Sequence, residues 1–576
     1  MPAPRLAGFS LRNFRSIGPD RVHVKLPESG PLVLIGENNA GKSNIVRAVD
    51  ILFNERWAST YTPEDHEFYG RDRSQVNIQL AAHLDQFSCD YCSGPITHLT
   101  WTYDEDRPGE PQQYRQKCGS CSSTYPKKTT KFRIMSMSVA AERSLNYQLS
   151  YSSRYTLLSR LMRRFHQELN SDESRKQTLR TIYESLVTQF HGVDAFSDFQ
   201  TLLSATTRLL GQNLPYALAI DFSAYDPSNY FHTLRVQPQF SGEVRSFDEL
   251  GTGQLQILAI AFAYAYAKAF GQGEGLLLLV DEPESNLHPL AQQWLARQLH
   301  ALTTDGLQII VTTHSPHFVD LAQQQSLVVV KRQGTSGPTT ATQCSRSGFV
   351  NALVELGAPA DRTTEQSVEE FYASAATVET TSGMFARACI VVEGRTEAFA
   401  LPELLRLVGF EALTKGIAFV SAEGISNIAK WCRLYGVYGI PTFAIFDTDS
   451  SKSGNDATRS ETAQKDIEST LRSGLTSIFP LESQNLYVSD NYATLDPDFE
   501  GCARSLLGPR WTELETQGRQ IVGASRAGKP LVARYAAKRM TPADLSPEAT
   551  RRLTELAEHI SALVPDSDAA SEDVAP

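Results

Sequence analysis

Residues 36–43, read as GENNAGKS, constrain the fold of this 576-residue chain more than any other segment. They match the pattern G-x-x-x-x-G-K-[ST]. The apolar run Leu32–Ile35 precedes them as a predicted strand, and residues 44–53 follow as a predicted helix. A glycine-rich loop between a strand and a helix turns successive backbone N–H groups toward one point, where the helix N-terminus adds partial positive charge. The sequence therefore predicts an α/β domain with a nucleoside triphosphate site.

Within this loop, Lys42 is predicted to reach the β- and γ-phosphates, and the Ser43 hydroxyl to hold Mg²⁺. The expected nucleotide-binding residues of the loop are Gly36, Asn38, Asn39, Gly41, Lys42 and Ser43.

Two later segments fit the same site. The apolar run 276–280 ends at the adjacent carboxylates Asp281 and Glu282. Asp281 is expected to join Ser43 at the Mg²⁺ of ATP, and Glu282 to polarise the attacking water. A second apolar run, 307–311, leads to His314, which we expect to contact the γ-phosphate from the opposite side.

This ordered set resembles the ABC-type ATPase heads of the SMC, RecF and OLD (overcoming lysogenization defect) families. Residues 13–17 resemble the usual first strand of such heads. Residues 250–254, LGTGQ, resemble their signature, with Gly253 and Gln254 in the usual places and the hydroxyl moved one residue later, to Thr252. In these families the signature of one head closes over ATP on another head. The resemblance therefore implies ATP binding by Gly253 and Gln254 and at least a dimer.

Four of the eight cysteines are grouped in two CxxC knuckles: Cys89, Cys92, Cys118 and Cys121. In a reducing compartment such pairs indicate a tetrahedral zinc site. Four thiolates close the coordination sphere, so the zinc would be structural. Coincidental turns and a redox dithiol are the alternatives.

Carboxylates also follow two strands in the second half of the chain. The predicted strand 388–392 leads into Glu393, and residues 442–446 lead into Asp447 and Asp449. Acidic side chains at the carboxyl ends of parallel strands lie where ligands bind in open α/β sheets. Their oxygens suit Mg²⁺ or Mn²⁺. The pattern predicts that these catalytic carboxylates bind metal ions, which activate water and stabilise the leaving oxygen in phosphodiester cleavage.

The glutamate and the D-x-D pair resemble a Toprim (topoisomerase–primase) domain, and Gly424 suits the glycine turn between its two acidic motifs. A head followed by Toprim, without a long coiled coil, resembles the OLD-family nucleases. That resemblance implies further metal ligands at Glu397 and in 496–500, where Asp496, Asp498 and Glu500 are the candidates, and a catalytic lysine at Lys529. Arg526, Arg534, Lys538 and Arg539 are candidates for a local phosphate-binding stripe, and a solvated helix face is the alternative for the last three.

The expected architecture is α/β, with an ABC-type ATPase domain over 1–345, a connector over 346–384, a Toprim domain over 385–564 and a disordered acidic tail over 565–576. The first domain is expected to carry a zinc insert at 85–125 and a helical insert at 150–212. The apolar faces of that helical insert serve core packing or subunit contact.

The net charge of −11 argues against a uniformly basic surface and leaves room for a local phosphate-binding stripe. The first residues lack an apolar signal region, and the longest apolar stretch, 257–267, is shorter than the ~20 residues that span a bilayer. We therefore expect a cytoplasmic protein with no membrane partner.

The resemblance implies an ATP-regulated, metal-dependent DNA endonuclease in anti-phage defence or DNA processing, with ATP, Mg²⁺ or Mn²⁺, and Zn²⁺ as cofactors. DNA, further copies of the chain, and a separate helicase or other defence protein are the expected partners. An RNA-cleaving toxin and an ATP-driven DNA clamp with a structural Toprim domain are the alternatives. A topoisomerase is disfavoured because no companion domain with a recognisable catalytic tyrosine is found.

Overall fold

The computed structural model describes residues 4–564, except 55–56, 74–75, 108, 128–129, 131–132, 140–156, 193–238, 241–242, 245–248, 271–274, 304–306, 333, 335–336, 472–484 and 523–527. The predicted tail, 565–576, lies outside the described residues. Two compact units divide the chain: Met1–Ser138 together with Gly273–Pro576, and Val139–Gln272.

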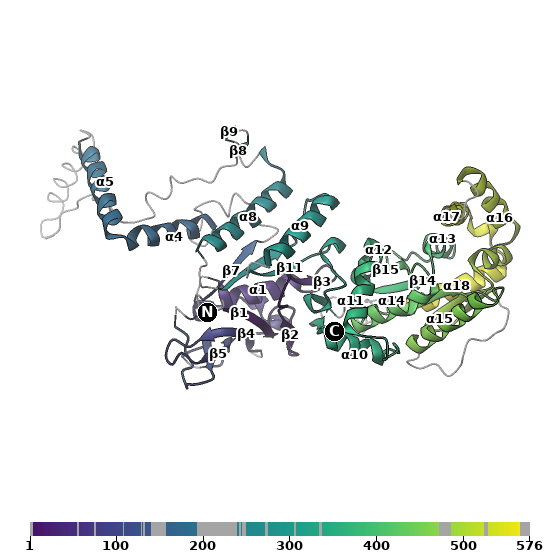
Figure 1. Ribbon diagram of the computed structural model, residues 1–576, viewed down its shortest axis with the longest axis horizontal. Helices are drawn as coiled ribbons and strands as arrows, with labels where there is room; N and C mark the ends of the chain where they lie inside the picture. The colour runs from purple at the N-terminus through teal and green to yellow at the C-terminus, as the bar shows by residue number, and fades with distance from the viewer. Residues whose placement is uncertain are drawn as a thin grey trace, which may run out of the picture. The chain divides into compact units, whose positions relative to one another are not determined.

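An antiparallel sheet opens the first unit (Figure 1). Its order is β2 (Val22–Lys25), β1 (Arg5–Arg12), β4 (Ile78–Ser88), β5 (Pro95–Tyr103) and β6 (Gln112–Cys118). Side chains alternate between buried and partly exposed along most of β4, because one face of the sheet covers the core. The cysteine segment is thus continuous with this sheet, since β5 and β6 extend it and the fully buried Trp101 of β5 belongs to the same core.

A second sheet holds the glycine-rich loop. Its order is β13 (Thr339–Gln343), β12 (Leu327–Arg332), β3 (Leu32–Ile35), β11 (Leu307–Thr312), β10 (Gly275–Asp281) and β7 (Ile134–Val139). β3 pairs in parallel with both β11 and β12, and β10 pairs in parallel with β11. All four residues of β3 are buried, as expected of a central parallel strand. Its carboxyl end leads through the loop into α1 (Lys42–Phe53), so the loop lies at the middle of the sheet edge.

The expected first strand at residues 13–17 is wrong. The strand is β1, which ends at Arg12, and residues 13–17 form a turn closed by a bridge between Phe14 and Ile17. Asn13 and Arg15 have φ angles of 56° and 53°. Left-handed backbone at these two positions cannot continue a strand.

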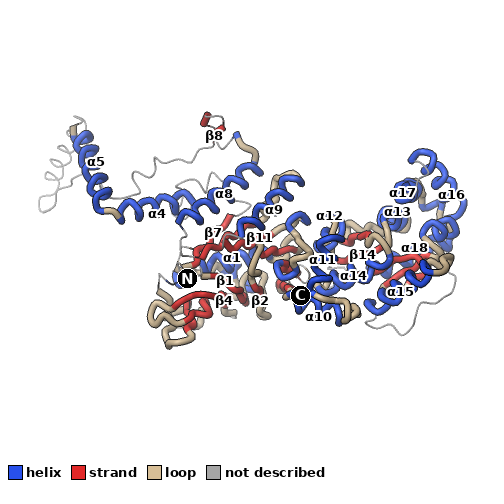
Figure 2. The backbone as a smooth tube through the Cα atoms, in the orientation of Figure 1, coloured by secondary structure: helices blue, strands red, loops and turns tan. Residues whose placement is uncertain are grey.

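The second unit contains α4 (Leu157–Ser171), α5 (Glu173–His191), the short strands β8 (Gln239–Phe240) and β9 (Glu243–Val244), and α8 (Thr252–Phe270). These are drawn in blue and red in Figure 2. The first two apolar faces predicted for the helical insert fall on α4 and α5. The third, at 199–210, lies outside the described residues.

The predicted connector is helical. It contains α10 (Arg346–Glu355), α11 (Glu365–Ala375) and α12 (Val378–Ser382). Tyr372 of α11 is buried, packs edge-to-face on Trp431 with ring centroids 5.5 Å apart, and donates a hydrogen bond to the Lys430 carbonyl at 2.9 Å. These contacts attach the segment to α14 (Ile425–Val437), a helix that contacts the C-terminal sheet.

The C-terminal sheet has the order β15 (Ile417–Ser421), β14 (Ala388–Val392), β16 (Thr442–Asp447), β18 (Tyr492–Leu495) and β17 (Leu486–Val488). All neighbours pair in parallel except β17 with β18. One face packs on the core shared by α13 (Arg395–Arg406), α16 (Phe499–Val522), α17 (Lys529–Ala537) and α18 (Pro547–Ala562). α14 (Ile425–Val437) and α15 (Asn455–Leu471) pack together, and α14 contacts β14 and β16. In open α/β sheets of this kind, ligands bind at the edge formed by the carboxyl ends of the parallel strands.

Across the described ranges, every helix is too short or too polar to cross a membrane.

Candidate active sites

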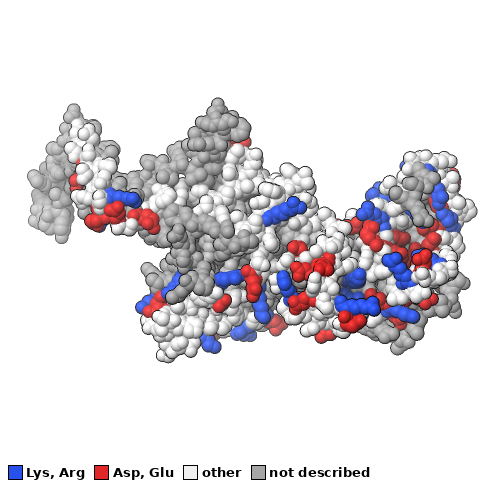
Figure 3. Space-filling view, viewed as in Figure 1, with Lys and Arg blue, Asp and Glu red and all other residues white. Residues whose placement is uncertain are grey.

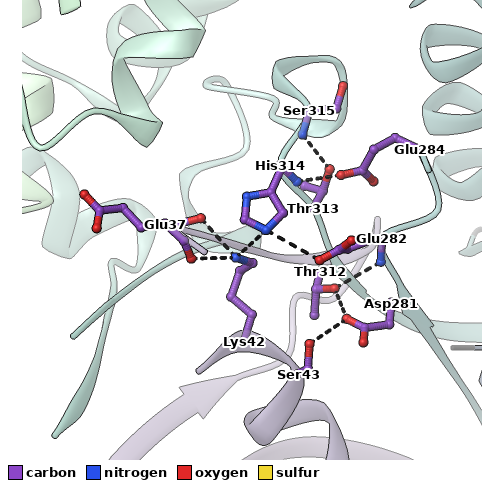
Figure 4. Close-up of polar contacts among 11 residues, drawn as sticks. Glu37, Lys42, Ser43, Asp281, Glu282, Glu284, Thr312, Thr313, His314 and Ser315 are labelled. Carbon is purple, nitrogen blue, oxygen red and sulfur yellow. Dashed lines mark hydrogen bonds and ion pairs between the residues drawn. The ribbon is translucent and has the colours of Figure 1, made fainter. Parts of the chain in front are cut away.

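The Lys42 amine lies at the centre of the nucleotide site (Figure 4). It donates hydrogen bonds to the carbonyl oxygens of Gly36 and Glu37 at 3.0 and 2.9 Å, and its Nζ lies 2.9 Å from His314 Nε2. Burial lowers the pKa of Lys42 to about 8, against the opposing effect of the nearby carboxylates of Glu282 and Asp281. A buried ammonium that donates to neutral carbonyls is well placed to donate instead to phosphate oxygens, which are stronger acceptors.

Asp281 is held at the end of β10 by two hydroxyls. Ser43 Oγ donates to Asp281 Oδ1 at 3.1 Å, and Thr312 Oγ1 donates to the same oxygen. The Glu282 N–H donates to Thr312 O at 3.0 Å. The three strand ends therefore bring together the two residues expected at Mg²⁺, Ser43 and Asp281.

His314 faces this cluster from the loop after β11. Its Nε2 lies 3.5 Å from Glu282 Oε1, and its backbone N–H donates to Glu284 Oε1 at 2.6 Å. Burial and the neighbouring Lys42 lower the pKa of His314, which favours the neutral ring. Glu284 is 9% exposed, and burial raises its pKa. Glu284 thus positions the loop that carries the histidine.

Among the predicted site residues other than glycine, three have left-handed backbone: Asn39 with φ 62°, Glu282 with φ 48° and Asp449 with φ 55°. This conformation is uncommon outside glycine and clusters at functional sites, where the surrounding structure supports its cost. Two separate sites in this chain carry it at a candidate catalytic carboxylate.

The signature segment lies in the second unit, at the start of α8. Gln254 Oε1 accepts a hydrogen bond from the Gly251 N–H at 3.2 Å, and Gly253 is buried. This bond closes the turn that begins the helix.

The four grouped cysteines converge, and their sulfur atoms all lie within 4.8 Å of one another. Cys89 Sγ is 3.8 Å from Cys121 Sγ, and Cys92 Sγ is 3.5 Å from Cys118 Sγ. The backbone N–H of Ser120 donates to Cys118 Sγ at 3.4 Å and helps lower the pKa of that thiol to about 7. Converging thiols with one stabilised thiolate fit a tetrahedral metal site.

The second predicted site lies at the carboxyl edge of the C-terminal sheet. Glu393 directly follows β14, and Asp447 ends the neighbouring parallel strand β16. The Asp447 N–H donates to Glu393 Oε2 at 3.4 Å. Glu397, in the first turn of α13, accepts from the Gly394 N–H at 2.8 Å. Figure 3 shows acidic side chains gathered on this domain with basic ones beside them.

Glu397 and Asp449 are buried, Glu393 and Asp447 are partly buried, and the four carboxylates repel one another. Burial, with the charges of Asp449 and Glu397, raises the pKa of Glu393 to about 7. Burial, with the charges of Glu397 and Glu393, raises the pKa of Asp447 to about 9. Asp447 Oδ1 is buried without a hydrogen-bond partner among the residues that the structure describes.

The donor set fits a divalent cation, because hard oxygens converge and one of them has no other partner. The carboxylate oxygens are more widely spaced than the sulfur atoms. Within the described part of the chain, the four cysteines are the one group of three or more metal-binding side chains with all ligand atoms within 4.8 Å of one another.

The remaining predicted residues border this acidic cluster. Asp498 accepts from the Gly501 N–H at 2.7 Å near the start of α16, and its charge contributes to the raised pKa of Asp447. Asp496 instead accepts from the Thr448 hydroxyl. Lys529 begins α17 and pairs with Glu500 at 3.0 Å.

The basic stripe has other contacts. The Arg534 and Arg539 guanidinium groups lie over the rings of Phe399 and Tyr535, and Lys538 lies 3.6 Å from Glu403. Arg526 falls outside the described residues.

Several neighbours were missed from the sequence. Lys452 Nζ pairs with Asp449 Oδ2 at 2.7 Å, and Ser460 Oγ donates a hydrogen bond to the same oxygen at 2.5 Å. Lys452 follows the D-x-D motif by three residues, a spacing that could have drawn attention to it. Thr312 and Glu284 carry no motif of their own and emerge only from the packing of strand ends.

Two family models match separate parts of the chain. Residues 113–320 match the family model described as AAA domain, putative AbiEii toxin, Type IV TA system. Residues 384–449 match the model described as Overcoming lysogenization defect protein-like, TOPRIM domain. The glycine-rich loop itself precedes the first match, while Asp281, Glu282 and His314 fall inside it.

Two curated relatives cover most of the chain. The OLD nuclease of Thermus scotoductus is 24% identical over 77% of this chain and 82% of its own length. The Old nuclease of Escherichia phage P2 is 21% identical over 77% of each chain. Among solved structures, the SMC head bound to the C-winged helix domain of ScpA is 14% identical, with a TM-score of 0.37, over 59% of this chain and 98% of that one.

The chain is therefore an α/β enzyme that combines an ATPase domain with a C-terminal OLD-like Toprim nuclease domain. The proteins it resembles over most of its length are OLD nucleases, which confirms the resemblance drawn from the motifs.

Proposed function

We propose that this protein is an ATP-regulated endonuclease that cleaves DNA with the help of divalent metal ions and serves anti-phage defence or DNA processing. The observation that carries the proposal is the meeting of Glu393, Asp447 and Asp449 at one edge of a parallel sheet, with a buried Asp447 oxygen available for a ligand. The two OLD nuclease relatives support the reaction class.

Glu393, Asp447 and Asp449 would hold Mg²⁺ or Mn²⁺, with Glu397, Asp498 and Glu500 as further ligands. The bound ions would activate water and stabilise the leaving oxygen. Lys529 would face the developing negative charge on the phosphate, and its pairing with Glu500 at 3.0 Å would hold the amine in position. In the head, Glu282 and His314 would act on the γ-phosphate while Gly253 and Gln254 of another copy close over it.

Cleavage assays test this function directly. Purified protein is incubated with plasmid DNA and, separately, with RNA, in the presence of Mg²⁺ or Mn²⁺ and with or without ATP. Metal-dependent nicking or cutting of DNA that responds to ATP is expected. Cleavage of RNA alone would point to a toxin, and ATP hydrolysis without cleavage of either substrate would point to a clamp.

Lys529→Ala should lower the cleavage rate by about 10²–10³, the usual cost of losing one positioned donor at a developing charge. Metal binding, followed by calorimetry with Mn²⁺, should change little, because the carboxylates remain. Lys538→Ala is the matched control, since Lys538 directly follows the same helix and pairs with Glu403 instead. Equal rates for wild type and Lys529→Ala would place the catalytic cation elsewhere.

We also expect one zinc ion per chain, held by Cys89, Cys92, Cys118 and Cys121. Elemental analysis of protein purified without added metal should find it. Cys92→Ser should lose most of the zinc, because a structural site needs all four ligands. Cys344→Ser, which alters a cysteine outside the group, should retain it. Well-folded wild type with no bound metal would refute the site.

A further inference from the structure

The cavity over the glycine-rich loop is walled in part by the Toprim domain. Its volume is about 970 Å³, which is ample for a nucleoside triphosphate. Residues 36–44, Glu282 and His314 line one side, and residues 384–387 line another. Both walls belong to the same compact unit. The four residues 384–387 directly precede β14, so the pocket borders the segment that leads into the strand before Glu393.

We propose that Arg387 is a nucleotide-binding residue that the Toprim domain supplies to the head, where its guanidinium binds the phosphates of ATP. This inference rests on the proposed ATP site. It adds a residue that no ATPase motif in the sequence contains.

The position of Arg387 is fixed from the Toprim side. Its backbone N–H donates to the Gly416 carbonyl at 2.8 Å, just before β15. Gly416 has a φ of +70°, and a Cβ atom there would come within 2.9 Å of Arg387 Cδ. Only glycine leaves room for the arginine stem to cross at this point.

The guanidinium then reaches the glycine-rich loop. Arg387 Nε lies 3.6 Å from Glu37 Oε1, and the two side chains are 39% and 55% exposed. An exposed pair at this distance is weak. Phosphate oxygens offer a guanidinium a stronger, bidentate partner, so ATP can displace the carboxylate.

Lys42 approaches the same residue from the other side, since its amine donates to the Glu37 carbonyl. Two cations therefore converge on Glu37, one from the head and one from the Toprim domain. A triphosphate bound in the loop would become the new partner of both Lys42 and Arg387. The Glu37 carboxylate would compete with that triphosphate for Arg387.

Two further hydrogen bonds join residues of the head to residues of the Toprim domain. Lys331 Nζ, on β12, donates to the Gly439 carbonyl at 2.5 Å. Tyr438 is 1% exposed, and its hydroxyl donates to the Gln324 carbonyl at 3.4 Å. β14 then runs as five fully buried residues from Arg387 to Glu393, a span of about 20 Å at the usual rise of a strand. A phosphate contact at Arg387 would act on one end of the strand that carries Glu393 at the other.

Three substitutions in the full-length protein test the proposal through ATP affinity, measured by calorimetry with a slowly hydrolysed ATP analogue. Arg387→Ala should weaken binding by about tenfold, in the range for loss of a charge-assisted hydrogen bond. Arg387→Lys should fall between Arg387→Ala and wild type. Glu37→Gln should bind more tightly than wild type, because the competing carboxylate is gone.

Opposite effects of Arg387→Ala and Glu37→Gln are the decisive result. If the pair only stabilised the fold, both variants would weaken binding alike, and that outcome would overturn the proposal, as would unchanged affinity in Arg387→Ala. Arg510→Ala, which removes an exposed arginine paired with Glu513 on α16, is the control and should bind as wild type. Absence of binding by wild type would instead refute the ATP site itself.

Discussion

Asp447→Ala is expected to abolish nucleic-acid cleavage while ATP hydrolysis stays within about twofold of wild type. Asp447 Oδ1 is the buried carboxylate oxygen without a hydrogen-bond partner in the described Toprim site. The substitution therefore removes the oxygen that is most available to bind a metal ion. The nucleotide cluster around Lys42 draws its carboxylates from the head and is untouched.

Two measurements on the same preparation check this. Plasmid cleavage and phosphate release from ATP are followed in parallel for Asp447→Ala and for Asp490→Ala, whose aspartate is 83% exposed on the same domain. Adding Mn²⁺ should raise the melting temperature of wild type and the control by more than that of Asp447→Ala, since ligands stabilise the state that binds them. Undiminished cleavage by Asp447→Ala would remove the Toprim carboxylates from the mechanism.

Lys42→Ala and Glu282→Gln should separate nucleotide binding from hydrolysis. Lys42→Ala should weaken ATP binding by at least about tenfold, because the substitution removes the buried ammonium at the loop. Glu282→Gln should still bind ATP and slow hydrolysis by about 10²–10⁴, the usual contribution of a general base. Asp281, held by Ser43 and Thr312, remains in place in that variant.

If ATP binding gates the nuclease, these two variants should shift cleavage in opposite directions when ATP is present. Cleavage is measured over a range of ATP concentrations, with Lys25→Ala, an exposed lysine on β2, as the control. Equal and ATP-insensitive cutting by wild type and both variants would show that the head serves as a scaffold. The test applies whether ATP promotes or restrains cutting, because coupling between two sites shows itself as a difference.

The central elements were predictable because short motifs are tied to strand ends. β3 and β14 have the predicted bounds, and β10, β11 and β16 differ from them by one residue at one or both ends. Continuous apolar runs identify buried parallel strands, and the polar residues that follow them must then lie at the carboxyl edge.

What was missed depends on contacts between distant segments. The turn at residues 13–17 has an apolar pattern compatible with a strand, and its left-handed residues are set by tertiary packing. Lys452, Glu284 and Arg387 gain their meaning from partners that no spacing rule connects to them. The connector looked polar because Glu, Ser and Thr cover the outer faces of its helices, while residues such as Tyr372 are buried.

The strand order of the head also sets the point in synthesis at which the sheet around the glycine-rich loop can form. β3 lies between β11 and β12, which are made some 270 residues later, so a ribosome has passed residue 332 before the strand that carries the loop gains both neighbours. The five strands of the Toprim sheet, in contrast, come from the continuous stretch 388–495. A nascent chain can therefore complete the sheet behind the glycine-rich loop before the Toprim strands are made, whereas the pocket wall at residues 384–387 arrives only with the Toprim segment.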